Sequence, residues 1–308
     1  MTARLSRTVL LLVLAVAQLA GVVALHRAFV RTVAGRYVDA VSLTGASIGF
    51  AHIETLVHAL LDIVSVASIV AAVVVIAFLA LLRRRYLLAT ATTVLVVGAI
   101  VTTELLKLYV FSRPAMEKAL PDLVEGNASN TLPSGHTTVA LSVAVAFVLV
   151  VPSAFRGLAA VAGAGYAALT GVATLSAQWH RPSDVVAACL VVGAWAAGVA
   201  AVAVLLSRHR RPEPMSGRPA AVLLGLLAVV ALAVGAVGLV MTKQVQPSDM
   251  DRSGLLVGYA GGAAAIVGAC AAVVTGTLAM APWVAPERGT SAAAASTGWW
   301  RPTVTGRR

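Results

Sequence analysis

The chain has 308 residues, of which 59% are hydrophobic and 11% charged, with a mean hydropathy of +0.92. About half of the residues of a soluble domain are apolar, so this composition excludes that class and predicts a membrane protein. The net charge of +11 comes from short clusters of Lys and Arg between apolar runs, a pattern that fits orientation signals and anionic lipid head groups better than nucleic acid.

Eight apolar runs are candidates for membrane spans, because a span needs about 20 apolar residues to cross about 30 Å of hydrocarbon. We therefore predict an all-α, polytopic transmembrane helical bundle. The first run is also compatible with a cleaved signal peptide, which would leave seven spans. The eight runs lie near residues 8–25, 57–82, 87–106, 137–155, 157–177, 184–206, 219–242 and 255–281.

Basic residues gather before the first run and in the second-to-third, fourth-to-fifth and sixth-to-seventh turns. The positive-inside rule makes this face cytoplasmic. An even number of spans then places both termini in the cytoplasm, and we expect a multi-pass protein of the plasma membrane. The residues concerned are Arg4, Arg7, Arg83, Arg84, Arg85, Arg156, Arg208, Arg210, Arg211 and Arg218. Cations in the opposite loops need another explanation, and we expect some of them to bind phosphate.

A polar, Pro-containing segment at 207–218 divides the chain. The two runs after it hold almost no ionisable residue, so they are interpreted as an addition to a six-span unit. We predict four parts: an N-terminal span and outer loop at 1–54, a catalytic core at 55–206, a two-span appendage at 207–281 and a disordered cytoplasmic tail at 282–308.

The first polar cluster lies at the end of the third predicted span, in LLKLYVFSRP. It places Lys107 and Arg113 beside Pro114. Two cations at the mouth of a span can neutralise phosphate oxygens, Arg through its planar fork and Lys as a point charge. Taken alone, the pair also fits two interfacial side chains that snorkel toward water.

The second cluster is TLPSGHTT, at the start of the fourth predicted span. Ser134 can cap that helix, Gly135 lets a ligand approach the backbone, and the free amides of the first turn favour an anion. His136 then stands beside the anion as a possible proton donor. A capping turn with an incidental His is the alternative for this cluster alone.

The third cluster is SAQWHRPSDVV, where Pro182 suits the first position of the sixth predicted span. His180 precedes Asp184 by four residues. A carboxylate at that spacing can hold one ring nitrogen while the other faces a substrate, as in an activated nucleophile or base. A helix cap with an acidic residue favoured by the dipole is the alternative.

Together the three clusters bring two helix N-termini, two His, one Asp and several cations to one membrane face. This combination is typical of phosphoryl transfer, in which one His attacks the phosphorus and the other protonates the departing oxygen. Fixed cations replace a metal, so we expect neither a metal nor another cofactor. The expected partners are a lipid phosphate substrate and the membrane lipids, and nothing in the sequence sets an oligomeric state.

These motifs resemble the type 2 phosphatidic acid phosphatase family, which shares its core with vanadium haloperoxidases and bacterial acid phosphatases. The resemblance covers about residues 55–206. It implies metal-independent hydrolysis of lipids such as phosphatidate, phosphatidylglycerophosphate or polyprenyl pyrophosphate, through a phosphohistidine. It also implies His180 as the nucleophile, Asp184 as its orienting partner, His136 as the general acid, and Lys107, Arg113, Ser134 and Gly135 as phosphate-binding residues.

The sequence departs from the family pattern at two places. Five residues separate Lys107 from Arg113, where the family usually has six. The family's third motif carries an Arg six residues before the His, and here that position is Thr174. Arg181, on the other side of His180, is a candidate to supply the missing charge.

Two other classes of function remain open at this point. A transporter or flippase for an anionic lipid would also have many spans and an outer anion site, although inverted repeats and mid-membrane ionisable residues would be expected. A catalytically inactive lipid-phosphate binder would fit the absence of the Arg at Thr174.

Overall fold

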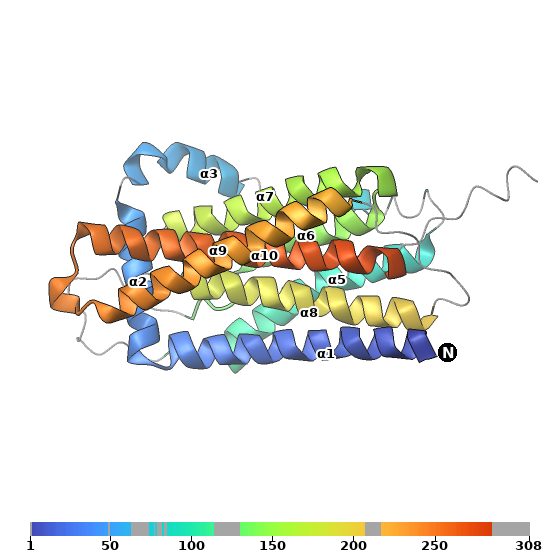
Figure 1. Ribbon diagram of the computed structural model, residues 1–308, viewed down its shortest axis with the longest axis horizontal. Coiled ribbons are helices and arrows are strands. Elements are labelled where there is room, and N and C mark those ends of the chain that lie inside the picture. The colour runs from blue at the N-terminus through green and yellow to red at the C-terminus, as the bar shows by residue number, and fades with distance from the viewer. Residues whose placement is uncertain are drawn as a thin grey trace, which may run out of the picture.

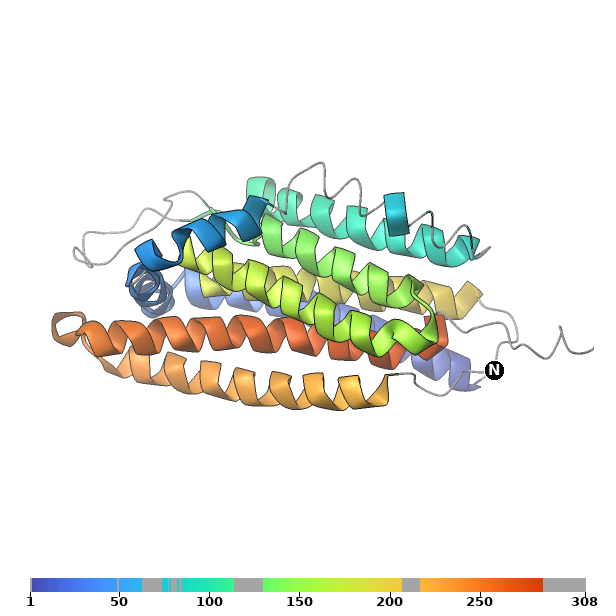
Figure 2. The same ribbon diagram turned by 90° about the horizontal axis from the view of Figure 1, so that it is seen from above.

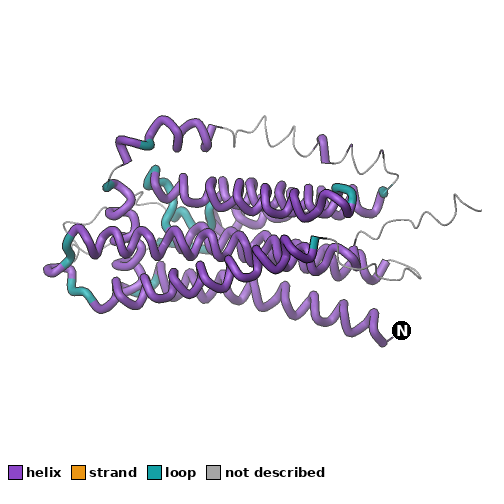
Figure 3. The backbone as a smooth tube through the Cα atoms, turned by 45° about the horizontal axis from the view of Figure 1, so that its top comes forward, coloured by secondary structure: helices purple, strands orange, loops and turns teal. Residues whose placement is uncertain are grey.

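The computed structural model describes residues 2–48, 50–62, 74–76, 78, 82, 85–113, 130–206 and 217–284. Within these residues the chain forms helices and connecting turns without any strand (Figure 3). The long helices are α1 (Thr2–Leu25), α5 (Tyr86–Leu105), α7 (Arg156–Ser176), α8 (Pro182–Leu206), α9 (Arg218–Gln244) and α10 (Arg252–Val284). The shorter α-helices are α2 (Val33–Ser47), α3 (Glu54–Asp62) and α6 (Gly135–Val150). Single π or 3-10 turns are formed by η1 (His26–Val30), η2 (Phe50–His52), η3 (Leu106–Val110), η4 (Ser153–Phe155) and η5 (Pro247–Asp249).

The long helices run along one axis as a bundle (Figure 1). In the described part of the chain, six segments are long and apolar enough to cross a membrane: Arg4–Val30, Tyr86–Val110, Ser153–Ser176, Pro182–Leu206, Arg218–Gln244 and Arg252–Val284. They correspond to six of the eight predicted spans. The prediction of an all-α, multi-pass membrane bundle is confirmed.

The other two predicted spans differ from expectation. The fourth is the apolar helix α6, whose 16 residues are fewer than the predicted run. It ends at Val150, two residues before Pro152, which has no amide hydrogen to donate to a continuing helix. The second begins as α3, and most of its remainder lies outside the described residues, as do residues 207–216. The tail was predicted to begin at 282, but residues 282–284 still belong to α10, and the rest of the tail lies outside the described residues.

Two ends of the bundle differ in their residues. At one end, α2 lies across the ends of the long helices (Figures 1 and 2). We call it the site end, because α6 and α8 begin there and α5 and α7 finish there. The opposite end carries the start of α1, α5, α7 and α9, and with them Arg4, Arg7, Arg85, Arg156 and Arg218.

Small residues let the helices approach closely. A Cβ added to Gly238 of α9 would lie 2.7 Å from the Cα of Gly261 in α10, so these two helices pack backbone to backbone. They lie side by side in both ribbon views (Figures 1 and 2). This close packing needs no polar side chain between the two helices.

The last helix also packs on the elements around the site end. A Cβ at Gly262 of α10 would lie 2.6 Å from the Pro182 ring at the start of α8. The hydroxyl of Tyr259 in α10 is 3.0 Å from that of Ser176, the last residue of α7. The domain boundaries stay a prediction, but α10 directly contacts the turn that carries the third polar cluster.

Candidate phosphoryl-transfer site

The three polar clusters meet at the site end, joined by one backbone hydrogen bond and by the side chain of Asn130. The amide of Ser134 donates to the carbonyl of Asp184 at 2.9 Å, which joins the second cluster to the third. The side chain of Asn130 donates to the carbonyls of Lys107 at 3.0 Å and Phe111 at 3.1 Å, which joins the first cluster to the second. The sequence analysis did not predict a linking role for Asn130, and its position just before the second cluster was the only available signal.

A pocket of about 290 Å³ lies where α5, α6 and the α7–α8 turn meet. The ring centroids of His136 and His180 are 6.1 Å apart, so two of the three predicted catalytic side chains share the pocket. The lining residues are Ile100, Thr103, Glu104, Lys107, Gly135, His136, Thr138, Val139 and His180. Of the predicted phosphate-binding residues, Lys107 and Gly135 therefore face this space.

Gly135 leaves space in the pocket, and Lys107 gives the pocket a positive charge. A Cβ at Gly135 would lie 3.4 Å from Oε1 of Glu104 and 3.6 Å from Nζ of Lys107, so a larger side chain would fill the pocket. Nζ of Lys107 pairs with Oε1 of Glu104 at 2.8 Å. The two residues are three apart, a spacing at which side chains on a helix can pair. The carboxylate holds the ammonium group in the pocket and also reduces the local positive charge.

Asp184 lies behind His180, fully buried in the first turn of α8. Its Oδ2 accepts hydrogen bonds from the hydroxyl of Thr131 at 2.6 Å and from the amide of Arg181 at 3.0 Å. Nδ1 of His180 is 3.7 Å from the same oxygen, longer than a hydrogen bond. Both Nδ1 of His180 and Oδ1 of Asp184 lack a hydrogen-bond partner. The carboxylate thus lies beside the ring nitrogen that it was predicted to orient, at a distance slightly longer than a hydrogen bond.

Three predicted phosphate-binding side chains lie behind the pocket instead of lining it. Ser134 is buried and caps α6, with Oγ accepting from the amide of Thr137 at 3.4 Å. Nη1 of Arg181 donates to the hydroxyl of Thr131 at 3.1 Å, and Nη2 of Arg113 is 3.8 Å from Oδ1 of Asp184. The two arginines therefore surround the orienting carboxylate.

Residues 85–208 match the family described as the PAP2 superfamily. This segment is similar to the PAP2 superfamily. It runs from the start of α5 beyond the end of α8 and contains all three polar clusters. No curated protein and no solved structure matches the chain. The predicted resemblance is confirmed, and a match to this superfamily suggests phosphatase activity in a membrane protein.

Helix α2 lies outside the PAP2 segment and contributes a buried acid that the sequence analysis missed. The carboxylate of Asp39 accepts from the hydroxyl of Ser183, next to Asp184. Burial, and then the charge of Asp184, raise the pKa of Asp39 to about 7. The interpretation of 1–54 as a span followed by a loop concealed this helix. Thr32, which caps α2 by accepting from the amide of Gly35, was the available sequence signal.

His136, in the second PAP2 cluster, faces a cationic surrounding. Burial lowers its pKa below the usual 6.5, and His180 and Lys107 lower it further. The centroid of the Trp179 ring lies 5.4 Å from that of His136 and 6.1 Å from that of His58 in α3. An exposed tryptophan therefore borders the mouth of the pocket. A bound phosphate dianion would offset the effect of the neighbouring cations and favour the protonated imidazole.

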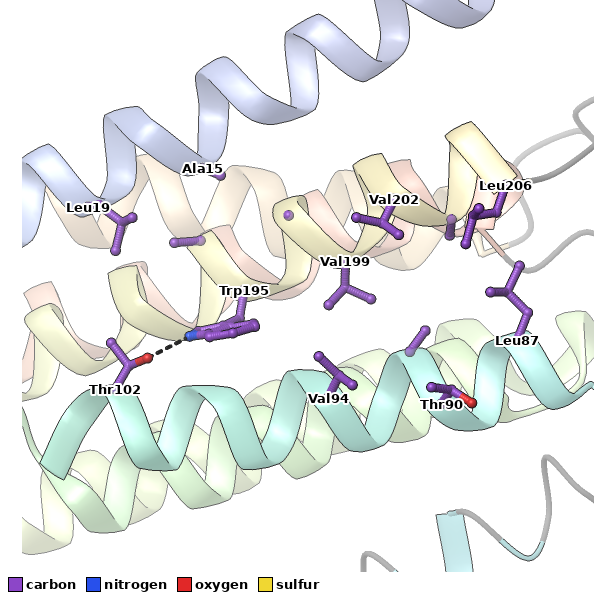
Figure 4. Close-up of a pocket in the computed structure, with 14 residues that line it drawn as sticks. Ala15, Leu19, Leu87, Thr90, Val94, Thr102, Trp195, Val199, Val202 and Leu206 are labelled. Carbon is purple, nitrogen blue, oxygen red and sulfur yellow. Dashed lines mark hydrogen bonds between the residues drawn. The ribbon is translucent and has the colours of Figure 1, made fainter. Parts of the chain in front are cut away.

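An apolar groove of about 470 Å³ lies on another face of the PAP2 segment, between α5, α8 and α1 (Figure 4). Nε1 of Trp195 donates to the hydroxyl of Thr102 at 3.0 Å near one limit of the groove. From there the groove runs toward Leu87 and Leu206 at the opposite end (Figure 4). Its side chains are almost all aliphatic, a lining that suits hydrocarbon and contains no catalytic group.

Proposed function

We propose that this protein hydrolyses a lipid phosphomonoester or diphosphate through a phosphohistidine intermediate at His180. The observation that carries the proposal is the pocket shared by His180, His136 and Lys107 at the N-terminus of α6. Free amides of a helix N-terminus and a fixed ammonium group favour a phosphate between the two rings. Asp184 beside Nδ1 of His180 leaves Nε2 as the attacking atom.

The proposed reaction has two displacements. In the first, Nε2 of His180 attacks phosphorus, the bond from phosphorus to the lipid oxygen breaks, and His136 donates a proton to that oxygen. In the second, His136 removes a proton from water, the hydroxide oxygen attacks phosphorus, the bond from phosphorus to Nε2 of His180 breaks, and inorganic phosphate leaves. Asp184 stabilises the positive charge on His180 while it carries the phosphoryl group.

We propose that fixed cations and backbone amides stabilise the negative charge of the transferred phosphoryl group, so that no metal takes part. Lys107 contributes from inside the pocket. Arg113 and Arg181 contribute positive charge beside Asp184, behind the pocket. Thr174 carries no charge and instead uses its backbone oxygen to accept from the amide of His180 at 3.2 Å.

We propose that the site faces the non-cytoplasmic side of the plasma membrane. The arginines at the opposite end of the bundle support this orientation, because positively charged loops stay in the cytoplasm. The N-terminus begins at that end, and α10 finishes there. A lipid substrate fits a site at the end of a membrane bundle, since its tail can stay in hydrocarbon while its phosphate reaches the pocket.

The test is release of inorganic phosphate by the purified protein in detergent with EDTA. The panel contains phosphatidate, phosphatidylglycerophosphate, and polyprenyl mono- and diphosphates. We expect His180→Ala to lower the rate by more than about a thousandfold, as for loss of a nucleophile. His52→Ala, which changes an exposed histidine outside the pocket, should retain the wild-type rate. Wild-type turnover by His180→Ala would refute the mechanism, and so would a rate that EDTA abolishes.

A lipid-phosphate binder without turnover is the second candidate, and the uncharged Thr174 is the observation that favours it. The two candidates separate in one pair of measurements. Binding of the same lipids without phosphate release would support the binder, whereas an acid-labile phosphoryl group on wild-type protein that is missing from His180→Ala would support the enzyme.

A further inference from the structure

The turn between α7 and α8 contains an unfavourable backbone conformation. Among the described residues, Gln178 is the single non-glycine residue with a positive φ, at 58° in the left-handed region. A residue with a Cβ adopts this region at a cost in free energy, and it does so where surrounding contacts hold it there. His180 follows two residues later, so the strained position lies beside the proposed nucleophile.

Helix α2 contacts this turn on the side that precedes His180. Nε2 of Gln178 donates to the carbonyl of Leu43 in α2 at 3.1 Å. Within the turn, the amides of Trp179 and His180 both donate to the carbonyl of Thr174, at 2.9 Å and 3.2 Å. Two donors that share one acceptor hold the turn less firmly than separate pairs would. The hydrogen bond to Leu43 therefore adds an attachment from outside the turn.

Helix α2 also contacts the turn on the side that follows His180. The carboxylate of Asp39 accepts from the hydroxyl of Ser183 and, at 3.4 Å, from its amide. Both residues are buried. Ser183 lies in the first turn of α8, where backbone amides have no acceptor within their own helix. Asp39 therefore caps α8 from another helix.

The space beside the start of α8 is not completely filled. A cavity of about 140 Å³ borders both Asp39 and Ser183, so packing alone does not fix Ser183 on this side. Asp184 is the next residue, and its Oδ2 lies 3.7 Å from Nδ1 of His180. A shift of Ser183 would change the distance between this carboxylate and the ring that it is proposed to orient.

We propose that Asp39 and Gln178 are positioning residues, through which α2 holds both sides of the turn that carries His180. Neither side chain lines the histidine pocket, so both act through the turn and not on the phosphate. The proposal rests on the proposed function, because it concerns the residue that would attack phosphorus. It adds α2, which lies outside the PAP2 segment, to the elements that catalysis needs.

The first experiment measures kcat and KM for lipid phosphate release by the full-length protein. Asp39→Ala removes both hydrogen bonds to Ser183, and kcat should fall about tenfold to a hundredfold, as for a displacement of about 1 Å at a reacting group. KM should change less than about twofold, because Lys107 and the start of α6 keep their places.

Asp39→Asn is the conservative variant that should recover most of the wild-type kcat. Its side-chain oxygen can accept from the amide of Ser183, and its NH₂ group can donate to the hydroxyl. Burial, which raises the pKa of Asp39 to about 7, already favours an uncharged group at this position. Recovery by Asn and loss in Ala would show that hydrogen bonding to the turn is what matters.

The matched control is Tyr37→Phe in the same helix. The hydroxyl of Tyr37 donates to the carbonyl of Val245 at 2.9 Å and contacts neither side of the turn. Its loss should lower Tm and leave kcat unchanged.

Gln178→Asn tests the other side of the turn. Asparagine adopts the left-handed conformation readily, but its side chain is one methylene group too short to keep the bond to Leu43. Its Tm should stay near that of wild type while kcat falls, a separation that a purely structural role would not produce.

An Asp39→Ala protein that folds and keeps the wild-type kcat would overturn the proposal, as would an equal loss of kcat in Tyr37→Phe. If Asp39→Ala does not fold, Ser183→Ala removes the hydroxyl of the same hydrogen bond, and its kcat decides. If wild type releases no phosphate from any lipid, the proposed function fails, and nitrogen NMR of histidine-labelled protein decides the positioning role. Asp39→Ala should then shift the Nδ1 signal of His180, which is identified by its loss in His180→Ala, and Tyr37→Phe should not. An unchanged signal in Asp39→Ala would overturn the proposal.

Discussion

Gly262 provides the sharpest test of how α10 supports catalysis. A Cβ there would lie 2.6 Å from Cγ of Pro182, which is two residues from His180. Carbon atoms in contact lie about 3.5 Å apart, so Gly262→Ala must displace the proline ring or α10 by about 0.9 Å. A displacement of about 1 Å at a reacting group can lower the rate about a hundredfold. Overpacking of this kind also costs about 1–3 kcal/mol of stability.

The matched control is Gly276→Ala in the same helix, since an added Cβ there meets nothing within 4 Å. It should stabilise the protein by up to about 1 kcal/mol, because Ala favours a helix over Gly, and should leave the rate unchanged. The assay is kcat for phosphate release beside Tm for each purified variant. If Gly262→Ala folds and retains the kcat of Gly276→Ala, then α10 does not position His180 and the reasoning is wrong.

Three further predictions concern charge. If His136 protonates the departing oxygen, kcat/KM should fall as the pH rises through a pKa below 6.5, and a rate that keeps rising above neutral pH would contradict that role. The folded-state pKa of Asp39, about 7 against the usual 3.8, contributes stability that is complete at acidic pH and lost as the pH rises toward 7. Asp39→Asn should therefore flatten the dependence of Tm on pH, and an unchanged slope would show that Asp39 titrates normally. Glu104→Gln should lower KM for lipid phosphates, because Lys107 no longer shares its charge with a carboxylate, and a raised KM would mean that Glu104 mainly holds Lys107 in place.

Hydropathy and capping residues predicted much of this fold. Six long apolar runs appear as long helices, and Ser134 caps α6 as its position before GHT indicated. These features depend on residues that are near one another in the sequence, so a local pattern is sufficient to find them. The same holds for His180 and Asp184, which lie four residues apart at the start of one helix.

Tertiary packing determines the features of the fold and the site that the sequence did not predict. Arg113 was expected to face phosphate, but its side chain direction depends on α1 and Asp184, which no local pattern specifies. Helix α2 escaped notice because its buried residues include Asp39, a charged side chain that usually indicates an exposed segment. The packing of α10 rests on glycines such as Gly262, whose importance comes from the atoms that approach them.

The position of α8 between α1 and α10 sets a lower limit on the length of a working fragment. Residues 85–208 alone would leave the apolar face of α8 uncovered, remove the carboxylate that pairs with Ser183, and free Pro182 from the helix on which it rests. A fragment cut at the borders of the PAP2 match should therefore aggregate or lose its histidine geometry. The smallest piece of this chain that can be expected to work by itself extends from α1 through α10.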